Sequence, residues 1–355
     1  MAGSSQGKSA PVRIGDVAAA AGVSTALVSY ALNGRPGVKD STRDHIIATA
    51  RKMGWTPSLR ARSLSVSRAY AIGLVFQANP EMLANDQYFT SLMAGIQSVL
   101  SASTYSLVTE VVARADAEAD AYQRLAGAGR VDGMIVVDLQ NDDGRFAFLR
   151  DSGLPFVSLG RPPGDTSMPV MLYDETDAIT EAVAHLAGLG HKLVAQVVGP
   201  QEGGAALLRR ELYQRMLRKH GLDGGWWVEA DYTAPGGRVA TEALLDAEAP
   251  PTAIIYSNDL MALAGMSVVY DRGLRIPEDV SIVGWDDTVV SQYLHPALST
   301  VSHHPYEDGQ MAAKLLLEAI EGRRFEVPIW TRNPRFVARQ STGPAPVQDT
   351  KNSSV

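Results

Sequence analysis

The chain has no cysteine among its 355 residues, which excludes disulfides, thiol nucleophiles and cysteine-ligated metal sites. It also has no apolar run near the ~20 residues that a membrane-spanning helix needs. The N-terminal segment MAGSSQGKSA has no apolar centre of the kind that a secretory signal peptide requires. We therefore expect a cytoplasmic protein without a membrane partner, and a secreted binding protein is disfavoured.

The sequence also lacks a recognisable catalytic motif. Gly127-Ala-Gly129 precedes an apolar run, whereas the glycines of a dinucleotide-binding fingerprint follow a strand. Neither a G-x-S-x-G motif nor a Walker loop is present. His303 and His304 are adjacent, but no third ligand is spaced to complete a metal site with them. We predict that the chain is not an enzyme and uses neither a cofactor nor a metal.

Charge is distributed unevenly along the chain. Residues 1–70 contain ten lysines and arginines and three acidic residues, a net charge of +7. The whole chain carries −7, so the remaining residues carry −14. A small basic module attracts polyanions, and an acidic body is repelled by them. The N-terminal segment is therefore a candidate for nucleic-acid binding, although a solvated basic face would have the same composition.

Residues 11–56 have the pattern of three short helices, after a polar segment at 1–10 that we expect to be disordered. Gly22 separates a helix predicted over 14–21 from one predicted over 25–32. Ser24 is a good N-cap for the second helix. Ser41 is expected to cap a third helix that ends at Gly54.

The first two helices predict a helix-turn-helix module. Small residues at the start of the second helix permit close approach to base edges and phosphates in a major groove. These residues are Ser24, Thr25, Ala26 and Ser29. A helix pair with a purely structural role is the alternative, but the local positive charge favours DNA.

From residue 70 onward the sequence alternates between apolar strands and amphipathic helices. Apolar runs occur at 71–76, 131–137, 154–159, 192–198, 251–257 and 280–285. This alternation predicts an α/β fold with buried parallel sheets, and the length suits two such units within residues 70–342. The tail at 343–355 is rich in proline, serine and threonine and is expected to be disordered.

Ligands of open parallel sheets bind at the carboxyl ends of the strands. The residues that follow the predicted strands are therefore candidates for a ligand site: Asn258 after one, Asp286 after another, with Tyr232 and Trp285 as possible borders. Amides, carboxylates and aromatic rings suit a hydroxyl-rich ligand. Structural roles are equally open at this stage, because Asn258 could cap the following helix and Asp287 could be a structural cap.

The N-terminal motifs resemble those of the lac repressor/galactose repressor family of bacterial transcription factors. The matching elements are Asp16-Val17-Ala18, Ala21-Gly22-Val23-Ser24, Val28-Ser29, Leu32-Asn33, Val38, Thr42-Arg43 and Pro57. Further matches in order are the segments 130–133, 185–191, 257–259, 273–277 and 280–287. The resemblance covers about residues 12–340. It implies an N-terminal three-helix module, a hinge helix, and a two-lobed effector domain like a type I periplasmic binding protein.

The resemblance implies roles for individual residues of the DNA-binding module. Ser24, Ser29, Asn33 and Thr42 would contact phosphates or fix the register, and Thr25, Ala26 and Tyr30 would face base edges. Many family members have arginine where this chain has Tyr30, so a bidentate arginine–guanine contact is absent there. Tyr30 could instead offer its hydroxyl group or stack on a thymine methyl, or it could be a packing residue.

Residues 57–69 match the hinge helix of the family. Leu64 falls where family members insert a leucine into the minor groove from each subunit of a dimer, which kinks the DNA. Arg60 and Arg62 suit the adjacent phosphates, and Ala61 is small enough to lie against the groove. The alternative is a linker in which Leu64 packs on the body.

The resemblance also assigns pocket residues. Tyr88 and Phe89 would line the pocket, and Arg209 aligns with the pocket arginine of the family, although Arg209 could instead pair with Glu211 or Asp231. We predict a homodimeric repressor that binds a pseudo-palindromic operator in double-stranded DNA. A carbohydrate is the first candidate for its effector, and a nucleobase or nucleoside is the second. The rival hypotheses are a cytoplasmic sugar-binding protein and a sugar-modifying enzyme, neither with a gene-regulatory role.

Overall fold

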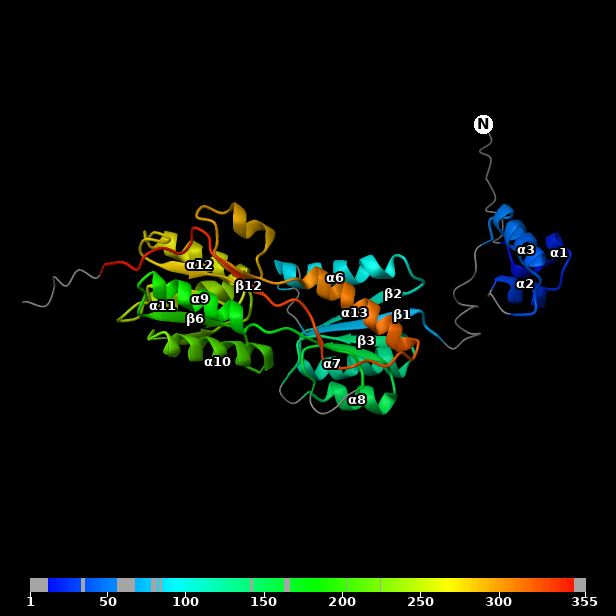
Figure 1. The fold of residues 1–355 in the computed structure, drawn as a ribbon, viewed down its shortest axis with the longest axis horizontal. Helices are drawn as coiled ribbons and strands as arrows, with labels where there is room; N and C mark the ends of the chain where they lie inside the picture. The colour runs from blue at the N-terminus through cyan, green and yellow to red at the C-terminus, as the bar shows by residue number, and fades with distance from the viewer. Residues whose placement is uncertain are drawn as a thin grey trace, which may run out of the picture. The chain divides into compact units, whose positions relative to one another are not determined.

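The computed structural model describes residues 12–32, 36–55, 68–77, 82, 85–140, 143–162, 167–202, 204–223 and 225–347. The chain divides into two compact units, residues 1–68 and 69–355, each of which is described by itself (Figure 1). The expected disordered segment 1–10, Asn33, and the hinge residues Arg60, Ala61 and Leu64 lie outside the described residues.

The first unit contains the helices α1 (Ile14–Ala21), α2 (Thr25–Leu32) and α3 (Asp40–Lys52). The bounds of α1 and α2 agree with those predicted from the sequence. Gly22 ends α1 with φ 68°, a left-handed conformation that glycine adopts without the steric penalty of a β-carbon. Of the described helices, none is by itself long and apolar enough to span a membrane; α1 and α2 pass that test only as a pair, and they are bent by 102°.

The three helices pack around a small apolar core. Its buried residues include Val17, Val28, Ile46 and Ala50, one or more from each helix. The predicted start of α3 was wrong: the N-cap is Lys39, and Ser41 lies inside the helix. The backbone N–H of Thr42 donates to the carbonyl oxygen of Lys39 at 3.0 Å, so the first turn closes before Ser41 can act as a cap.

The second unit has two lobes, each with a parallel sheet. The N lobe contains a six-stranded sheet of order β11-β5-β4-β3-β1-β2 in which every pair is parallel. Its strands are β1 (Ala71–Gln77), β2 (Ser106–Val112), β3 (Gly133–Val136), β4 (Phe156–Leu159), β5 (Val170–Leu172) and β11 (Ile329–Trp330). Its helices are α6 (Gln87–Leu100), α7 (Ala115–Tyr122), the π-helical turn η1 (Gln123–Gly127), α8 (Arg145–Ser152) and α13 (Pro305–Ile320).

The C lobe contains a four-stranded parallel sheet of order β7-β6-β8-β9. The strands are β6 (Val194–Val198), β7 (Trp227–Glu229), β8 (Ala253–Tyr256) and β9 (Ser281–Val283). The helices are α9 (Thr176–Gly188), α10 (Gly204–Lys219), α11 (Ala234–Leu245), α12 (Asp259–Asp271) and the 3-10 turn η2 (Val289–Tyr293). The predicted fold class, α/β with parallel sheets, is confirmed.

The chain passes between the lobes three times. It leaves the N lobe after β5, returns after β10 (Thr300–Ser302), and enters the C lobe again at β12 (Arg335–Val337). β10 and β12 pair with each other in antiparallel orientation, with Val301 opposite Phe336. Because α13 lies between these passages, it packs beside α6 in the N lobe although more than 200 residues separate them in sequence (Figure 1).

The ordered part of the C lobe continues beyond residue 342. The N–H of Gly343 donates to Oγ of Ser281 at 3.1 Å, and the N–H of Ala345 donates to the carbonyl oxygen of Leu189 at 2.8 Å. The expected start of a disordered tail at 343 is therefore too early, since these backbone groups pair with the C lobe. Residues 348–355 lie outside the described part of the chain.

Candidate functional site

One face of α2 carries the candidate DNA-binding residues. Ser24, Thr25 and Ala26 are exposed, Ser29 is half-buried, and Tyr30 is 44% exposed. The opposite face buries Val28 and Ala31 in the core of the module. The helix therefore presents these side chains away from its packing surface, as a helix that enters a groove must do.

Two side-chain contacts hold the ends of α2. Oγ of Ser24 accepts a hydrogen bond from the N–H of Leu27 at 3.2 Å, the N-cap interaction expected from the sequence. At the other end, Nη1 of Arg43 donates to the carbonyl oxygen of Ala31 at 3.1 Å, where the helix dipole favours a cation. Thr42, from the same turn of α3, is half-buried, so this part of α3 adjoins the end of α2.

The ring of His303 lies close to an aromatic ring from each lobe, Tyr88 of the N lobe and Trp285 of the C lobe. The ring of Tyr88, in the first turn of α6, stacks on the ring of His303 with 5.3 Å between centroids. His303 lies in the passage that follows β10. Phe89 is 5% exposed and packs edge-on against Phe76 and Tyr88, so it belongs to the core of the N lobe and supports Tyr88 from behind.

Arg209 lies between an acidic group and an aromatic face. Its Nε and Nη2 atoms donate to the two carboxylate oxygens of Glu175 at 3.0 and 2.7 Å, and its guanidinium carbon lies 3.9 Å from the ring centroid of Trp285. Such a bidentate pair fixes both the position and the plane of the guanidinium. The acidic partner is thus Glu175, 34 residues away, and neither Glu211 nor Asp231 takes that place.

Asp286 and His303 form a buried polar pair. Oδ1 of Asp286 lies 2.7 Å from Nε2 of His303, and both side chains are nearly enclosed. Burial raises the pKa of the Asp286 carboxyl well above its usual range and lowers the pKa of the His303 imidazole to about 4. Both shifts favour the uncharged forms, so the pair offers hydrogen-bonding groups and no positive charge at neutral pH.

Several residues around this region have positive φ although they are not glycine. They are Asp138 (49°), Tyr232 (63°), Asp286 (114°) and Asp287 (54°). Non-glycine residues in this conformation are uncommon and gather at functional sites, where the surrounding structure holds them in place. All four follow strands of the sheets at their carboxyl ends, the edge at which parallel sheets bind ligands.

Asn258 positions its neighbours. Its Oδ1 accepts from the N–H of Met261 at 2.9 Å, and its Nδ2 donates to the carbonyl oxygen of Tyr232 at 2.9 Å. Asn258 is 3% exposed and caps α12, which was the structural alternative considered from the sequence. Asn258 therefore also holds the backbone of Tyr232, whose side chain is half-buried.

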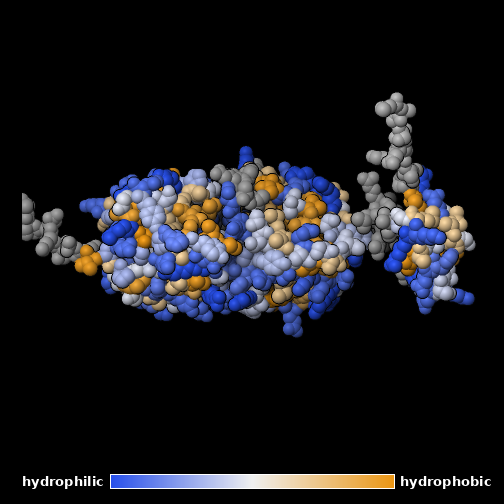
Figure 2. Space-filling view, turned by 90° about the horizontal axis from the view of Figure 1, so that it is seen from above, coloured by the Kyte–Doolittle hydropathy of each residue, from blue (hydrophilic) through white to orange (hydrophobic). Residues whose placement is uncertain are grey.

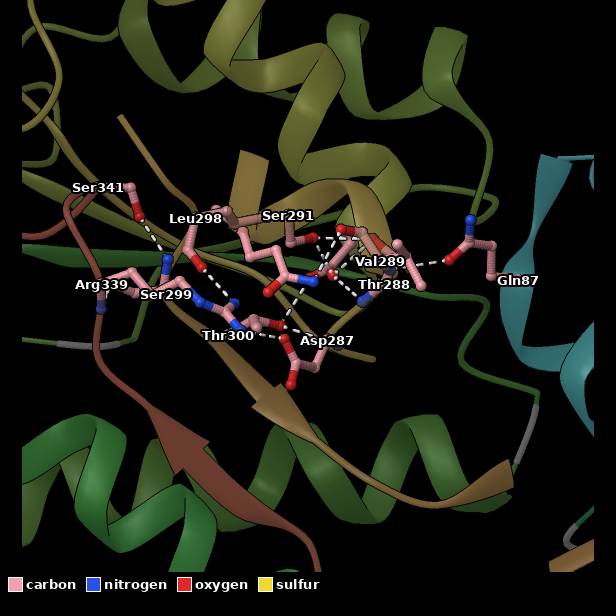
Figure 3. Close-up of polar contacts among 12 residues, drawn as sticks. Gln87, Asp287, Thr288, Val289, Ser291, Leu298, Ser299, Thr300, Arg339 and Ser341 are labelled. Carbon is pink, nitrogen blue, oxygen red and sulfur yellow. Dashed lines mark hydrogen bonds and ion pairs between the residues drawn. The ribbon is translucent and has the colours of Figure 1, made fainter. Parts of the chain in front are cut away.

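A buried carboxylate beside Asn258 organises the turn η2. Asp259 accepts four hydrogen bonds, from the N–H and Oγ1 of Thr288, from Oγ of Ser291 and from Oγ1 of Thr300. Figure 3 shows Thr288, Ser291 and Thr300 turned toward one another, with Asp287 paired to Arg339 next to them. In the same view, the N–H of Val289 donates to Oε1 of Gln87, which joins the C lobe to the N lobe at 3.1 Å.

Sequence reasoning missed three residues of this region: Asp138, Glu175 and His303. Asp138 lies two residues after β3 and falls under the strand-end rule that selected Asp286. Glu175 carries no local signal, because its partner Arg209 belongs to another helix. His303 was considered only as part of a metal pair; no cluster of three or more metal-binding side chains occurs among the residues that the structure describes.

The N lobe also has a cavity of about 210 Å³ beside α7 and α8, away from the aromatic rings and Arg209. Its charged side chains already pair with one another: Arg145 contacts Glu118 at 2.7 Å and Asp143 at 2.6 Å. We regard the region between the lobes as the candidate ligand site, since it combines strand ends, aromatic faces and hydrogen-bonding groups from both lobes.

Comparison with known proteins agrees with this architecture. The family model for bacterial regulatory proteins of the lacI family matches residues 13–58, and the model for a periplasmic binding protein-like domain matches residues 183–342. The chain is 30% identical over 333 residues to the probable HTH-type transcriptional repressor ExuR of Bacillus subtilis (strain 168), covering 93% of this chain and 98% of that protein.

Two solved structures are similar over nearly the whole chain. One is the lac repressor dimer bound to operator and the anti-inducer ONPF, with TM-score 0.80, 28% identity, and coverage of 94% of this chain and 100% of that chain. The other is the complex of the transcriptional regulator CelR with cellobiose, with TM-score 0.70, 27% identity, and coverage of 93% and 99%.

Proposed function

Since this chain belongs to the LacI family of bacterial regulatory proteins, it is a DNA-binding transcriptional regulator, and we propose that a carbohydrate bound between its lobes controls its affinity for an operator. The resemblance inferred from the sequence is thereby confirmed. The relatives are transcriptional regulators and not enzymes. A bacterial transcriptional regulator acts on the chromosome, so we propose that the protein is located in the cytoplasm, at the nucleoid.

The exposed face of α2 supports the DNA-binding half of this proposal. Thr25, Ala26 and Tyr30 lie on that face of a basic module, and the short side chains allow the helix to approach base edges closely. Ser24, Ser29, Asn33 and Thr42 would contact phosphates. Arg60, Ala61 and Leu64 would contact the central minor groove; they lie outside the described residues and stay a prediction from the sequence.

The proposal that an effector binds between the lobes rests on one observation: polar and aromatic side chains from both lobes lie at the same site. Tyr88 comes from the N lobe, and Arg209, Tyr232 and Asp286 come from the C lobe. Aromatic faces with fixed hydrogen-bonding groups suit the apolar faces and hydroxyl groups of a sugar ring. The CelR structure was solved with cellobiose, which makes a sugar the first class of effector to test.

We also propose a homodimer, because a pseudo-palindromic operator requires two reading modules related by a two-fold axis. Figure 2 shows groups of apolar side chains on the surface of the C lobe. The turn η2 contributes Val289, which is 64% exposed, and Tyr293, which is 69% exposed. Exposed apolar residues that follow one another in this way are candidates for a subunit interface.

Selection of bound duplexes from a random DNA library tests the reading module without knowledge of the operator. We expect the purified protein to enrich a two-fold symmetric sequence and to lose affinity steeply as salt increases. Thermal shift with cellobiose, simple hexoses and nucleosides then tests the effector. If no DNA sequence is enriched at low salt, either with or without these ligands, the proposed function as a DNA-binding regulator is rejected.

A further inference from the structure

The charge of Arg209, the arginine placed in the proposed effector site, is already compensated. The carboxylate of Glu175 accepts hydrogen bonds from Nε and Nη2 of Arg209. The two side chains are 11% and 15% exposed, so little solvent screens the pair. Nη1 makes no hydrogen bond to any residue in the described part of the chain, and it can still donate to an uncharged acceptor.

Apart from Arg209, the side chains named above for the proposed site supply no positive charge, and the nearby Arg145 is paired with Glu118 and Asp143. His303 is held in its uncharged form by burial, which lowers its pKa to about 4. The phenols of Tyr88 and Tyr232 both lie within electrostatic reach of Asp138 from the N lobe and Asp286 from the C lobe. An anionic ligand would therefore lose its hydration next to carboxyl groups without gaining an unpaired cation.

We infer that Glu175 determines the charge class of the effector: by neutralising Arg209, it leaves a cleft that admits uncharged or amine-bearing carbohydrates and rejects carboxylated and phosphorylated ones. This inference rests on the proposed carbohydrate effector. Glu175 is a positioning and specificity-determining residue in this view, because it acts on the ligand through Arg209.

The position of Glu175 makes an isosteric test possible. Glu175 precedes α9 and is its N-cap residue, but its side chain makes no capping bond. Oδ1 of Asp174 instead accepts from the N–H of Thr176 at 2.9 Å. Glu175→Gln therefore removes the charge and leaves the start of the helix intact. Glu211→Gln is the matched control, because Glu211 is exposed on α10 and the same charge is removed.

Inorganic phosphate is the first probe, since it needs no knowledge of the effector. Melting temperatures of the wild-type protein, Glu175→Gln and Glu211→Gln are measured as phosphate replaces chloride at constant ionic strength. We expect a saturable rise for Glu175→Gln alone, which is lost in the double variant Glu175→Gln/Arg209→Gln. An equal response of Glu175→Gln and Glu211→Gln, or a saturable rise in the wild-type protein, would overturn the inference.

Matched sugars are the second probe. Glucose, glucosamine, glucuronate and glucose 6-phosphate, with their galactose counterparts, share ring shapes and differ in charge. We expect binding to the wild-type protein to be confined to the uncharged or amine-bearing members, with glucuronate or the phosphate esters at least tenfold weaker. Tighter binding of an anionic member than of its neutral counterpart overturns the inference. If no carbohydrate binds, the proposed effector class is rejected. The phosphate experiment then decides separately whether Glu175 neutralises the charge of Arg209.

Discussion

The ring of Tyr232 lies directly on the backbone of Gly199, at the end of β6. A β-carbon built on Gly199 would lie 2.0 Å from Cζ and 2.2 Å from Oη of Tyr232. The backbone of Tyr232 has φ 63° and its carbonyl oxygen is held by Asn258, so the residue as a whole cannot move away from Gly199 without breaking that hydrogen bond. Glycine at position 199 is therefore a condition for the placement of this aromatic side chain in the proposed effector site.

We expect Gly199→Ala to displace Tyr232 and to weaken the effector response about tenfold, at a cost of about 1–3 kcal/mol in folding free energy from overpacking. Urea unfolding and the effector-induced thermal shift measure the two effects. Gly188→Ala is the control, because a β-carbon at Gly188 meets nothing within 4 Å. An unchanged effector response in folded Gly199→Ala would remove Tyr232 from the proposed site.

Replacement of Tyr30 tests the reading face of α2. If Tyr30 contacts a base, Tyr30→Ala should weaken binding to the selected operator by about 1–3 kcal/mol and leave binding to unrelated DNA and its salt dependence unchanged. Fluorescence anisotropy with both duplexes at several salt concentrations gives these values. His45→Ala, an exposed change in α3, is the control. A loss of thermal stability without loss of sequence preference would instead identify Tyr30 as a packing residue.

Asp308 should make stability depend on pH. This residue lies in the first turn of α13 and is 8% exposed, and burial raises the pKa of its carboxyl to about 6. The folded state then holds a proton between the unfolded pKa near 3.8 and the folded pKa, so stability is lost as pH rises through that window.

Asp308→Asn removes this dependence. Relative to the wild-type protein, it should gain up to about 3 kcal/mol in unfolding free energy between pH 4 and pH 7, about 1.4 kcal/mol for each pH unit of the shift. Urea unfolding across this range measures the difference. Glu307→Gln is the exposed neighbour that serves as control. A constant difference between Asp308→Asn and the wild-type protein at all pH values contradicts the assignment.

Asp259 should contribute strongly to the stability of the C lobe. Its side chain is fully buried and accepts four hydrogen bonds, so Asp259→Asn places an N–H₂ group against hydroxyl and N–H donors. We expect a loss of at least about 3 kcal/mol in unfolding free energy. Asp271→Asn at the other end of α12, where the side chain is 56% exposed, should cost less than about 1 kcal/mol. Equal losses in the two variants would show that the buried network adds nothing.

Tyr293 tests the proposed homodimer. A charged residue in a buried apolar interface lacks a partner, so Tyr293→Asp should raise the dimer dissociation constant at least a hundredfold, or about 2.7 kcal/mol. Analytical ultracentrifugation over a concentration series measures it. Val239→Asp is the control, because Val239 is equally exposed but lies on α11. Dimers of unchanged strength in Tyr293→Asp would exclude η2 from the interface.

The sequence predicted elements whose signals are local. Gly22 and Ser24 gave the bounds of α1 and α2 because a left-handed turn and an N-cap depend on neighbouring residues alone. The long apolar runs likewise marked the central strands. The strands β2, β5, β7, β10, β11 and β12 were not predicted. All of them except β2 have only two or three residues, and β2 is a partly exposed strand at the edge of its sheet, so it forms no continuous apolar run.

The prediction of the site residues was limited in the same way, because contacts between distant segments leave no local signal in the sequence. Asp286 and Asn258 followed from the strand-end rule, but the rule cannot separate a ligand-facing carboxyl from an amide that caps a helix. The expected partners of Arg209 were close in sequence, yet Glu211 is two residues away on a helix and so points to a different side. The actual partner, Glu175, approaches because the first passage between the lobes brings it beside α10, which is a property of the tertiary fold.

The threefold passage between the lobes has a consequence for biosynthesis. The N lobe needs α13, whose Ala312 and Leu316 fill the core against Leu92 and Ile96, and the C lobe needs β12 and the segment through 347. A ribosome therefore completes neither lobe before it has translated most of the gene, although domains commonly fold as units during synthesis. A nonsense mutation upstream of α13 would release two unfinished lobes with open cores, and such fragments depend on chaperones or are degraded.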